Sequence, residues 1–292
     1  MDVLTQIIVS GLTLGAMYAI STVGLSLVYG SLNMLNMAHG GILTIGGYSA
    51  YAVSQQLGWP PAFGFVAALV VGAAIGLLIF VATAWPLLSS KSFETNIFIA
   101  TIGVGAVFEN IVLKLFGPYA KPQPLNIAGG IKVSAVLVPY QNISILVVAV
   151  VMMILVALLL QRSRTGRAIR ATAQNRDAAR LMGVNVVRVY AQVLALSGAL
   201  AAVSGVMISS LATLSPTMGG DPMLKAFIIC VVAGLGNTYG AVAAAVVIGL
   251  IEASTQYVLG VRFGFALLLL LVIAVLIWRP SGIFGKNRVV RL

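Results

Sequence analysis

Long apolar runs separated by short polar stretches make up nearly all of the chain. A transmembrane helix needs about 20 mainly apolar residues to cross the hydrocarbon core, and most of the runs meet that length. The pattern therefore predicts an all-α, polytopic transmembrane helical bundle of about eight to ten spans. The runs lie near residues 3–29, 36–54, 63–88, 95–117, 142–161, 189–213, 222–237, 240–259 and 263–278.

Two of these runs carry interruptions. In the first half, SLNMLNMAHGG at 31–41 is rich in Asn and Gly, and in the second half GLGN at 234–237 ends a short run. Non-helical backbone at membrane depth has to be buried in protein or line a cavity. We therefore expect one or two broken or re-entrant segments. Paired interruptions in the two halves of a transporter point to a substrate path, and whether the halves form a true structural repeat stays open.

Composition supports a membrane protein throughout. Sixty per cent of the 292 residues are hydrophobic and 8% are charged, whereas soluble domains carry about 25% charged residues. No polar stretch is long enough to fold separately, so we expect residues 1–292 to form one multi-pass transmembrane domain.

The net charge of +11 is concentrated in two short segments. Seven arginines against one aspartate give +6 to the loop 162–188, and three arginines with one lysine give +4 to the tail 279–292. Basic segments beside apolar spans are typical of cytoplasmic loops. Their contact is expected with anionic lipid headgroups and not with nucleic acid. An odd number of spans then places the N-terminus and the loop 118–141 outside.

The loop 162–188 contains signals for two short helices. Thr165 can cap a first helix that continues to about Gln174, and Asn175 can cap a second one. Gly183 is placed to end the second helix in the left-handed conformation. An apolar strip on a helix outside the membrane favours a protein groove as its partner, although an ordinary surface loop also fits. The residues expected at this contact are Asp177, Ala178, Ala179, Leu181, Met182 and Gly183.

Several stretches resemble the permeases of ABC importers for branched-chain amino acids, a family of the hydrophobic amino acid and urea type. DAARLMG at 177–183 is similar to the EAA-type loop of such permeases. The resemblance extends over 166–206, GLTLGAMYAISTVGLSLVYGSLNMLNMAHGG at 11–41, ATIG at 100–103 and GLGNTYGAVAAAVVIGLIEA at 234–253. It covers nearly the whole chain.

The resemblance implies a permease subunit of an ATP-driven importer in the bacterial inner (cytoplasmic) membrane. Such a subunit pairs with a second related permease or an identical chain, takes its solute from a periplasmic substrate-binding protein, and is driven by two ATP-binding subunits. The second short helix of the loop would be the coupling helix. The sequence contains no G-x-x-x-x-G-K-[ST] phosphate-binding loop, so ATP hydrolysis is expected in partner subunits, and no cofactor is expected in this chain.

Polar residues at the first interruption are candidates for the substrate path. Ionisable groups at membrane depth are costly and suggest function, and His39 is the only histidine of the chain. The ring could touch a polar solute, or it could be a neutral group bonded to a neighbouring helix. Relatives often carry an acidic residue directly after the His-Gly pair, where this chain has glycine, which leaves the solute's identity open. The candidates here are Asn33, Asn36, His39, Gly40 and Gly41.

Two glutamates complete the set of candidates. Glu109 is assigned to the path. Lys114 is not on the same helical face, so an ion pair within the helix is poor, and the carboxyl group could instead be neutral or bonded to a partner helix. Glu252 is favoured as a structural group. No second histidine and only one cysteine are present, so no metal site is expected.

Three classes of function remain in view. The first is an importer permease for branched-chain or other amino acids, or for urea, short amides or small organic acids. The second is an ion-coupled secondary transporter that uses the histidine and the glutamates as proton sites. The third is an intramembrane enzyme, which the absence of a G-x-S-x-G nucleophile motif disfavours.

Overall fold

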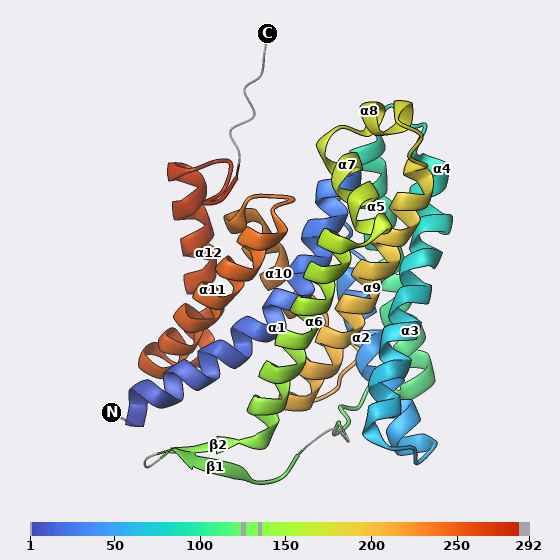
Figure 1. Ribbon diagram of the computed structural model, residues 1–292. Coiled ribbons are helices and arrows are strands. Elements are labelled where there is room, and N and C mark those ends of the chain that lie inside the picture. The colour runs from blue at the N-terminus through green and yellow to red at the C-terminus, as the bar shows by residue number, and fades with distance from the viewer. Residues whose placement is uncertain (1, 124–126, 134–135, 286–292) are drawn as a thin grey trace.

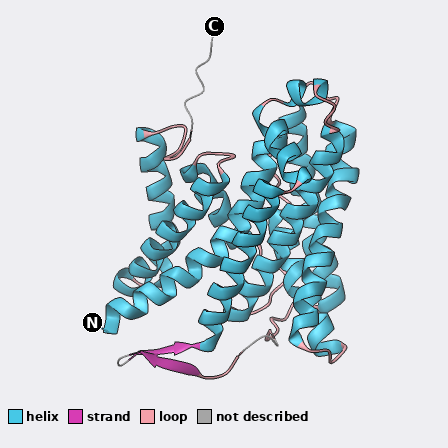
Figure 2. Ribbon diagram, viewed as in Figure 1, coloured by secondary structure: helices cyan, strands magenta, loops and turns pink. Residues whose placement is uncertain are grey.

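The computed structural model describes residues 2–123, 127–133 and 136–285. Most of these residues are helical, and the described part holds one antiparallel hairpin of two strands (Figure 2). Seven stretches of helix are long and apolar enough to cross a membrane. The expected all-α, polytopic membrane fold is confirmed.

The long spans correspond to seven of the nine apolar runs. They are α1 (Asp2–Leu32), the continuous α3 (Pro61–Ile79), η2 (Phe80–Ala84) and α4 (Trp85–Leu87), α5 (Phe93–Phe116), α6 (Tyr140–Arg162), α9 (Val186–Leu211), α11 (Thr238–Leu259) and α12 (Val261–Trp278). The remaining elements are α2 (His39–Tyr51), the π-helical η1 (Ala52–Gln56), β1 (Gly130–Val133), β2 (Val136–Pro139), α7 (Arg164–Gln174), α8 (Arg176–Leu181) and α10 (Gly220–Ala233).

The helices connect two ends of the bundle (Figure 1). The N-terminus and the hairpin β1–β2 lie at one end, here called the hairpin end, and α7 and α8 lie at the other, here called the basic end. α12 finishes toward the basic end, where Arg279 follows it. The loop 162–188 and the start of the tail therefore lie at one end of the bundle, and the N-terminus and the described part of the loop 118–141 at the other, as the charge pattern predicts. The other basic residues of the tail, Lys286, Arg288 and Arg291, lie outside the described residues.

The two runs that lack a long helix contain α2 and α10, of 13 and 14 residues. Each is preceded by non-helical chain that runs into the bundle. Residues 33–38 descend from the basic end, since Asn33 bonds Glu94 at the start of α5 whereas Ala38 lies against Gly105 near its middle. The break expected at SLNMLNMAHGG is therefore present.

The break in the second half lies ahead of α10 and not at GLGN, which forms the turn between α10 and α11. Residues 212–219 climb from the hairpin end, where Leu214 and Lys121 exchange two backbone hydrogen bonds of 2.9 and 3.0 Å. This segment was missed because its polar residues, TLSPTMGG at 213–220, read as an ordinary loop.

The N-termini of the two short helices meet inside the bundle. A side chain at Gly219 would overlap the Gly40 carbonyl, so only glycine allows this approach. Thr44 completes the contact, because its hydroxyl oxygen accepts from the Gly219 amide at 3.1 Å and its hydroxyl donates to the Gly40 carbonyl at 3.2 Å. One half-helix thus continues toward the hairpin end and the other toward the basic end.

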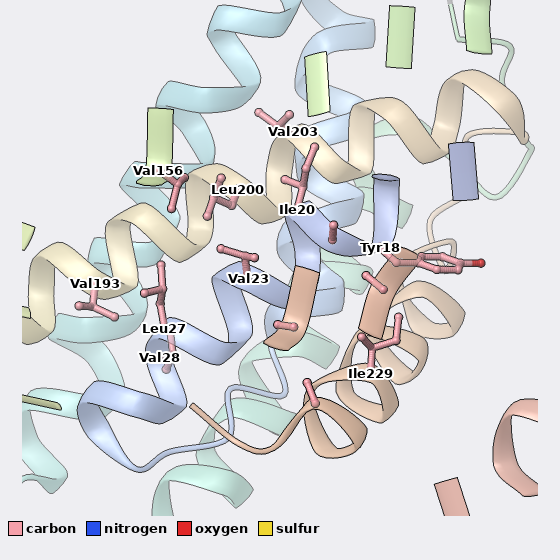
Figure 3. Close-up of a cluster of buried hydrophobic side chains, with 14 of the residues drawn as sticks. Tyr18, Ile20, Val23, Leu27, Val28, Val156, Val193, Leu200, Val203 and Ile229 are labelled. Atoms are coloured by element: carbon pink, nitrogen blue, oxygen red, sulfur yellow. The ribbon is translucent and has the colours of Figure 1, made fainter. Parts of the chain in front are cut away.

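The central helix of the bundle is α9, which packs against α1, α2 and α3. In Figure 3, Val193, Leu200 and Val203 of α9 lie beside apolar side chains of α1. Small residues allow close helix packing, which drives association in lipid. The close contact between α3 and α9 occurs at Gly72 and Gly198, where a side chain on either residue would overlap the other's backbone carbonyl.

We expect Gly198→Ala to lower the free energy of unfolding by about 1–3 kcal/mol, because the added methyl group overpacks the α3–α9 contact. The matched control is Gly103→Ala on α5, where an added methyl group meets no atom within 4 Å. Thermal unfolding in detergent micelles measures both. Equal melting temperatures for the two variants would contradict the packing assignment.

Candidate functional site

His39 begins α2 and is completely buried. Its Nε2 lies 3.0 Å from the hydroxyl oxygen of Ser21 in α1, and its Nδ1 has no hydrogen-bond partner in the described part of the chain. Asn36 shapes the turn before it, with its side-chain oxygen accepting from the Ala38 amide at 3.1 Å. In this conformation His39 holds the start of α2 against α1, whereas Asn36 fixes the turn that leads into α2.

Gly40 and Gly41 place the start of α2 between two other helices. Gly40 lies against Gly219 and Met223 on the α10 side, whereas a Cβ at Gly41 would come 3.0 Å from the Phe108 side chain of α5. A long acidic side chain at position 41 would therefore meet the Phe108 ring. The absence of a side chain at Gly41 leaves the space that Phe108 occupies.

Asn33 lies apart from His39, at the basic end. It has a positive φ of 57°, which is uncommon outside glycine and best tolerated by Asn and Asp. Its side-chain amide donates to Glu94 at 2.7 Å, linking the end of α1 to the start of α5. Both residues line a polar cavity of about 740 Å³ whose other wall includes Arg176 and Asp177 of α8. The structure therefore places Asn33 beside the loop 162–188.

Glu109 is half-buried on α5, directly after Phe108. It makes no hydrogen bond or ion pair within the described residues. Because Phe108 touches Gly41, Glu109 lies at the depth where α2 and α10 begin. It is thus close in depth to His39 and far from Asn33.

A partly buried ion pair on α10 and α11 was missed from the sequence. Lys225 Nζ lies 2.6 Å from Glu252 Oε1 and donates to the Tyr18 hydroxyl oxygen at 3.1 Å. Gln256 donates to the same glutamate oxygen at 3.0 Å. Figure 3 shows the Tyr18 hydroxyl pointing away from the labelled apolar side chains. The pair joins three helices and supports the structural role that was favoured for Glu252.

The sequence signal for this cluster was the pair Asp221 and Lys225, one helical turn apart inside an apolar run. Asp221 is exposed at the first turn of α10, close to the junction with α2. The two charges, on Asp221 and Lys225, were overlooked because the residues around them are mostly apolar.

The helix α8 has the local structure that its sequence predicts. The Asn175 side chain accepts from the Asp177 and Ala178 amides, both at 3.0 Å, and Gly183 ends the helix with φ of 81°. The cap of α7 differs, because Ser163 accepts from the Gly166 amide at 2.8 Å in the place expected for Thr165. Ser163 lies between α6 and α7, and its hydroxyl also donates to the Leu159 carbonyl of α6 at 2.6 Å.

The C-terminal end of α8 exposes two large apolar side chains. Leu181 and Met182 are 89% and 84% exposed at its end. Asp177, Ala178 and Gly183 are exposed as well, whereas Ala179 is only 4% exposed and faces the bundle. Ala179 thus attaches the helix to its own chain, while the other five residues remain free for a partner.

No group of three or more His, Cys, Asp or Glu residues that could hold a metal occurs in the described ranges.

Comparison with known proteins identifies the family. Residues 7–277 match the family described as the permease component of the branched-chain amino acid transport system. The chain belongs to this permease family.

Relatives of this permease come from bacteria and archaea. It is 31% identical over 294 residues to the high-affinity branched-chain amino acid transport system permease protein LivH of Escherichia coli (strain K12), covering 96% of this chain and 95% of LivH. It is 30% identical over 298 residues to the corresponding protein BraD of Pseudomonas aeruginosa, covering 97% and 96%. The probable branched-chain amino acid transport permease protein LivH of Methanocaldococcus jannaschii is 29% identical, covering 90% of this chain and 87% of LivH. These relatives are transport permeases, and this permease is a multi-pass membrane protein.

We expect His39→Ala to lower the free energy of unfolding by about 1–3 kcal/mol, since it leaves a buried hydroxyl group without its partner. Ser21→Ala should cost a similar amount. The double variant should cost clearly less than the sum of the two, because both remove one hydrogen bond. Thermal unfolding in detergent measures all three. Additive losses, or unchanged stability with loss of transport, would favour contact between the ring and the solute.

We expect Lys225→Met to destabilise the permease by about 3–5 kcal/mol, because it leaves the buried Glu252 carboxylate unpaired. Replacing both partners, as Lys225→Met with Glu252→Gln, should recover most of this loss. The same unfolding assay gives the answer. A double variant as unstable as Lys225→Met would show that the ion pair is not the source of the loss.

Proposed function

We propose that this chain is a permease subunit of an ATP-driven importer in the bacterial inner membrane, and that it moves branched-chain or other small amino acids by alternating access. Residues 1–292 act as one permease domain without a cofactor of its own. A second permease, either identical or related, completes the membrane part. Two ATP-binding subunits hydrolyse ATP, and a periplasmic binding protein delivers the solute.

The observation that carries this proposal is the exposed apolar end of α8. Leu181 and Met182 lie on a short helix that projects from the basic end, and lipid cannot cover them there (Figure 1). Large exposed apolar side chains outside the membrane mark a protein contact. The sequence has no phosphate-binding loop of its own, so a separate ATP-binding subunit is the partner that fits.

We place the solute path along α5, the start of α2 and the start of α10. Asp221 and Asn110 are exposed at the depth of the junction, and Glu109 is half-buried beside them. Polar groups at this depth are costly against lipid and are found facing protein or a water-filled cavity. A second permease subunit against this face would enclose them in a shared path.

Motion of α8 has a direct route to this path. The Ala179 carbonyl accepts from the Val184 amide at 3.0 Å, and α9 begins at Val186, so α8 and α9 are closely linked. α9 in turn packs on α1, α2 and α3. A displacement of α8 by its ATP-binding partner would therefore shift α2 relative to α10.

We expect Leu181→Asp to reduce ATP-driven leucine uptake by roughly tenfold or more, because it places a charge in a desolvated protein contact. Leu181→Met is the matched control and should retain uptake. The assay uses proteoliposomes that contain the complete transporter and its binding protein. Melting temperatures of the purified permease should be the same for both variants.

Two results would contradict the proposal. Normal uptake by Leu181→Asp would remove α8 from the coupling contact. Uptake driven by a proton gradient without any ATP-binding subunit would favour an ion-coupled secondary transporter.

A further inference from the structure

An apolar groove of about 750 Å³ lies between α1, α6 and α11. Ala16 and Ala19 of α1 form part of its lining, Ala149 and Met153 of α6 another part, and Ala243 of α11 a third. The lining of α6 extends from Leu146 to Leu160, which is about 21 Å at 1.5 Å per residue. This exceeds half of the ~30 Å hydrocarbon core, so the groove is long enough for an acyl chain.

The groove leads into a smaller cavity at the basic end. This cavity of about 190 Å³ shares Leu160, Thr238 and Tyr239 with the groove. Its lining adds Arg170 and Asn237. Across the opening, the Gln161 amide donates to the Tyr239 hydroxyl oxygen at 2.9 Å, which bridges α6 and α11. The cavity that contains Arg170 therefore adjoins the apolar groove at its basic end.

The charge of the small cavity is positive. Arg170 donates to the Leu160 carbonyl through one nitrogen, and because a guanidinium has five N–H donors, others remain for a ligand. No aspartate or glutamate lines the cavity or the groove. Arg162, Arg164 and Arg167 add positive charge near the same end of α6. An anion is the group that this arrangement would bind.

We propose that this groove binds an anionic diacyl phospholipid, with the phosphate group at Arg170 and an acyl chain between α1, α6 and α11. Basic pockets between transmembrane helices on the cytoplasmic side bind anionic headgroups. The proposal uses the assignment of the basic end to the cytoplasm. It also uses the placement of the solute path on α5, α2 and α10, which leaves α1, α6 and α11 to face lipid.

The bound lipid would join α7 and α8 to the rest of the bundle. Arg170 belongs to α7, which leads directly into α8, whereas Tyr239 and Asn237 lie at the start of α11. A phosphate group between these elements would hold α7 against α11. The lipid would thus stabilise the position of α7 and α8, on which the ATP-binding subunit acts.

The test measures lipid retention by the purified full-length permease without its partners. The protein is mixed in detergent with equal amounts of phosphatidylglycerol and phosphatidylcholine of identical acyl chains, and native mass spectrometry counts the bound lipids. Wild-type protein should retain phosphatidylglycerol about fivefold to tenfold more than phosphatidylcholine. Arg170→Gln should abolish this preference, and the matched control Arg164→Gln, which removes the same charge outside both cavities, should keep it.

A second pair of variants tests the apolar groove. Ala243→Phe fills it and should reduce retention of both lipids severalfold. Val247→Phe adds a similar ring to an exposed position one turn further along α11, outside the groove, and should have no effect. If Arg170→Gln does not fold, this pair of variants still tests whether the groove binds a phospholipid.

Three outcomes would overturn the proposal. They are equal retention of the two lipids by wild-type protein, equal losses in Arg170→Gln and Arg164→Gln, and unchanged retention in Ala243→Phe. A disulfide between two copies of Ala243→Cys in native membranes would also overturn it, since protein would then cover the groove. All four are independent of transport, so they do not bear on whether the chain is an importer permease.

Discussion

The need to cover backbone polar groups inside the membrane constrains this fold more than any other factor. Residues 33–38 and 212–219 are non-helical at membrane depth, so their amide and carbonyl groups must find partners within protein. The chain meets this need by bringing both segments against the junction of α2 and α10. Thr44 bonds across the junction, and Gly40 and Gly219 allow the backbones to touch.

The junction also determines where polar chemistry can occur. Asp221 lies exposed in the first turn of α10, close to the point where the two half-helices begin. His39 and Ser21 hold α2 to α1, and Lys225 with Glu252 holds α10 to α11. The half-helices are thus fixed on their outer sides, and the start of α2 also packs on Phe108 of α5. The proposed solute path would therefore run along a junction that neighbouring helices support on several sides.

The parts of the structure that depend on local sequence could be predicted, and those that depend on contacts between distant segments could not. Hydropathy located the seven long spans, and Asn175 with Gly183 bounded α8, because caps act within a few residues. The partners of His39 and Glu252 are 18 and 27 residues away. Asn33 was grouped with His39 by proximity in sequence, although the non-helical residues 34–38 carry them to different depths. The second break was missed because a re-entrant loop and an external loop have the same polar composition.

The ion pair between Lys225 and Glu252 has a consequence for how the protein enters the membrane. With 14 residues, of which two are charged, α10 is shorter than the roughly 20 apolar residues that a helix needs to insert alone. Its lysine has the Tyr18 hydroxyl of α1 as one partner, but its charge is neutralised only when Glu252 of α11 is present, and the GLGN turn between the two helices is short. We therefore expect α10 and α11 to insert together as a helical hairpin.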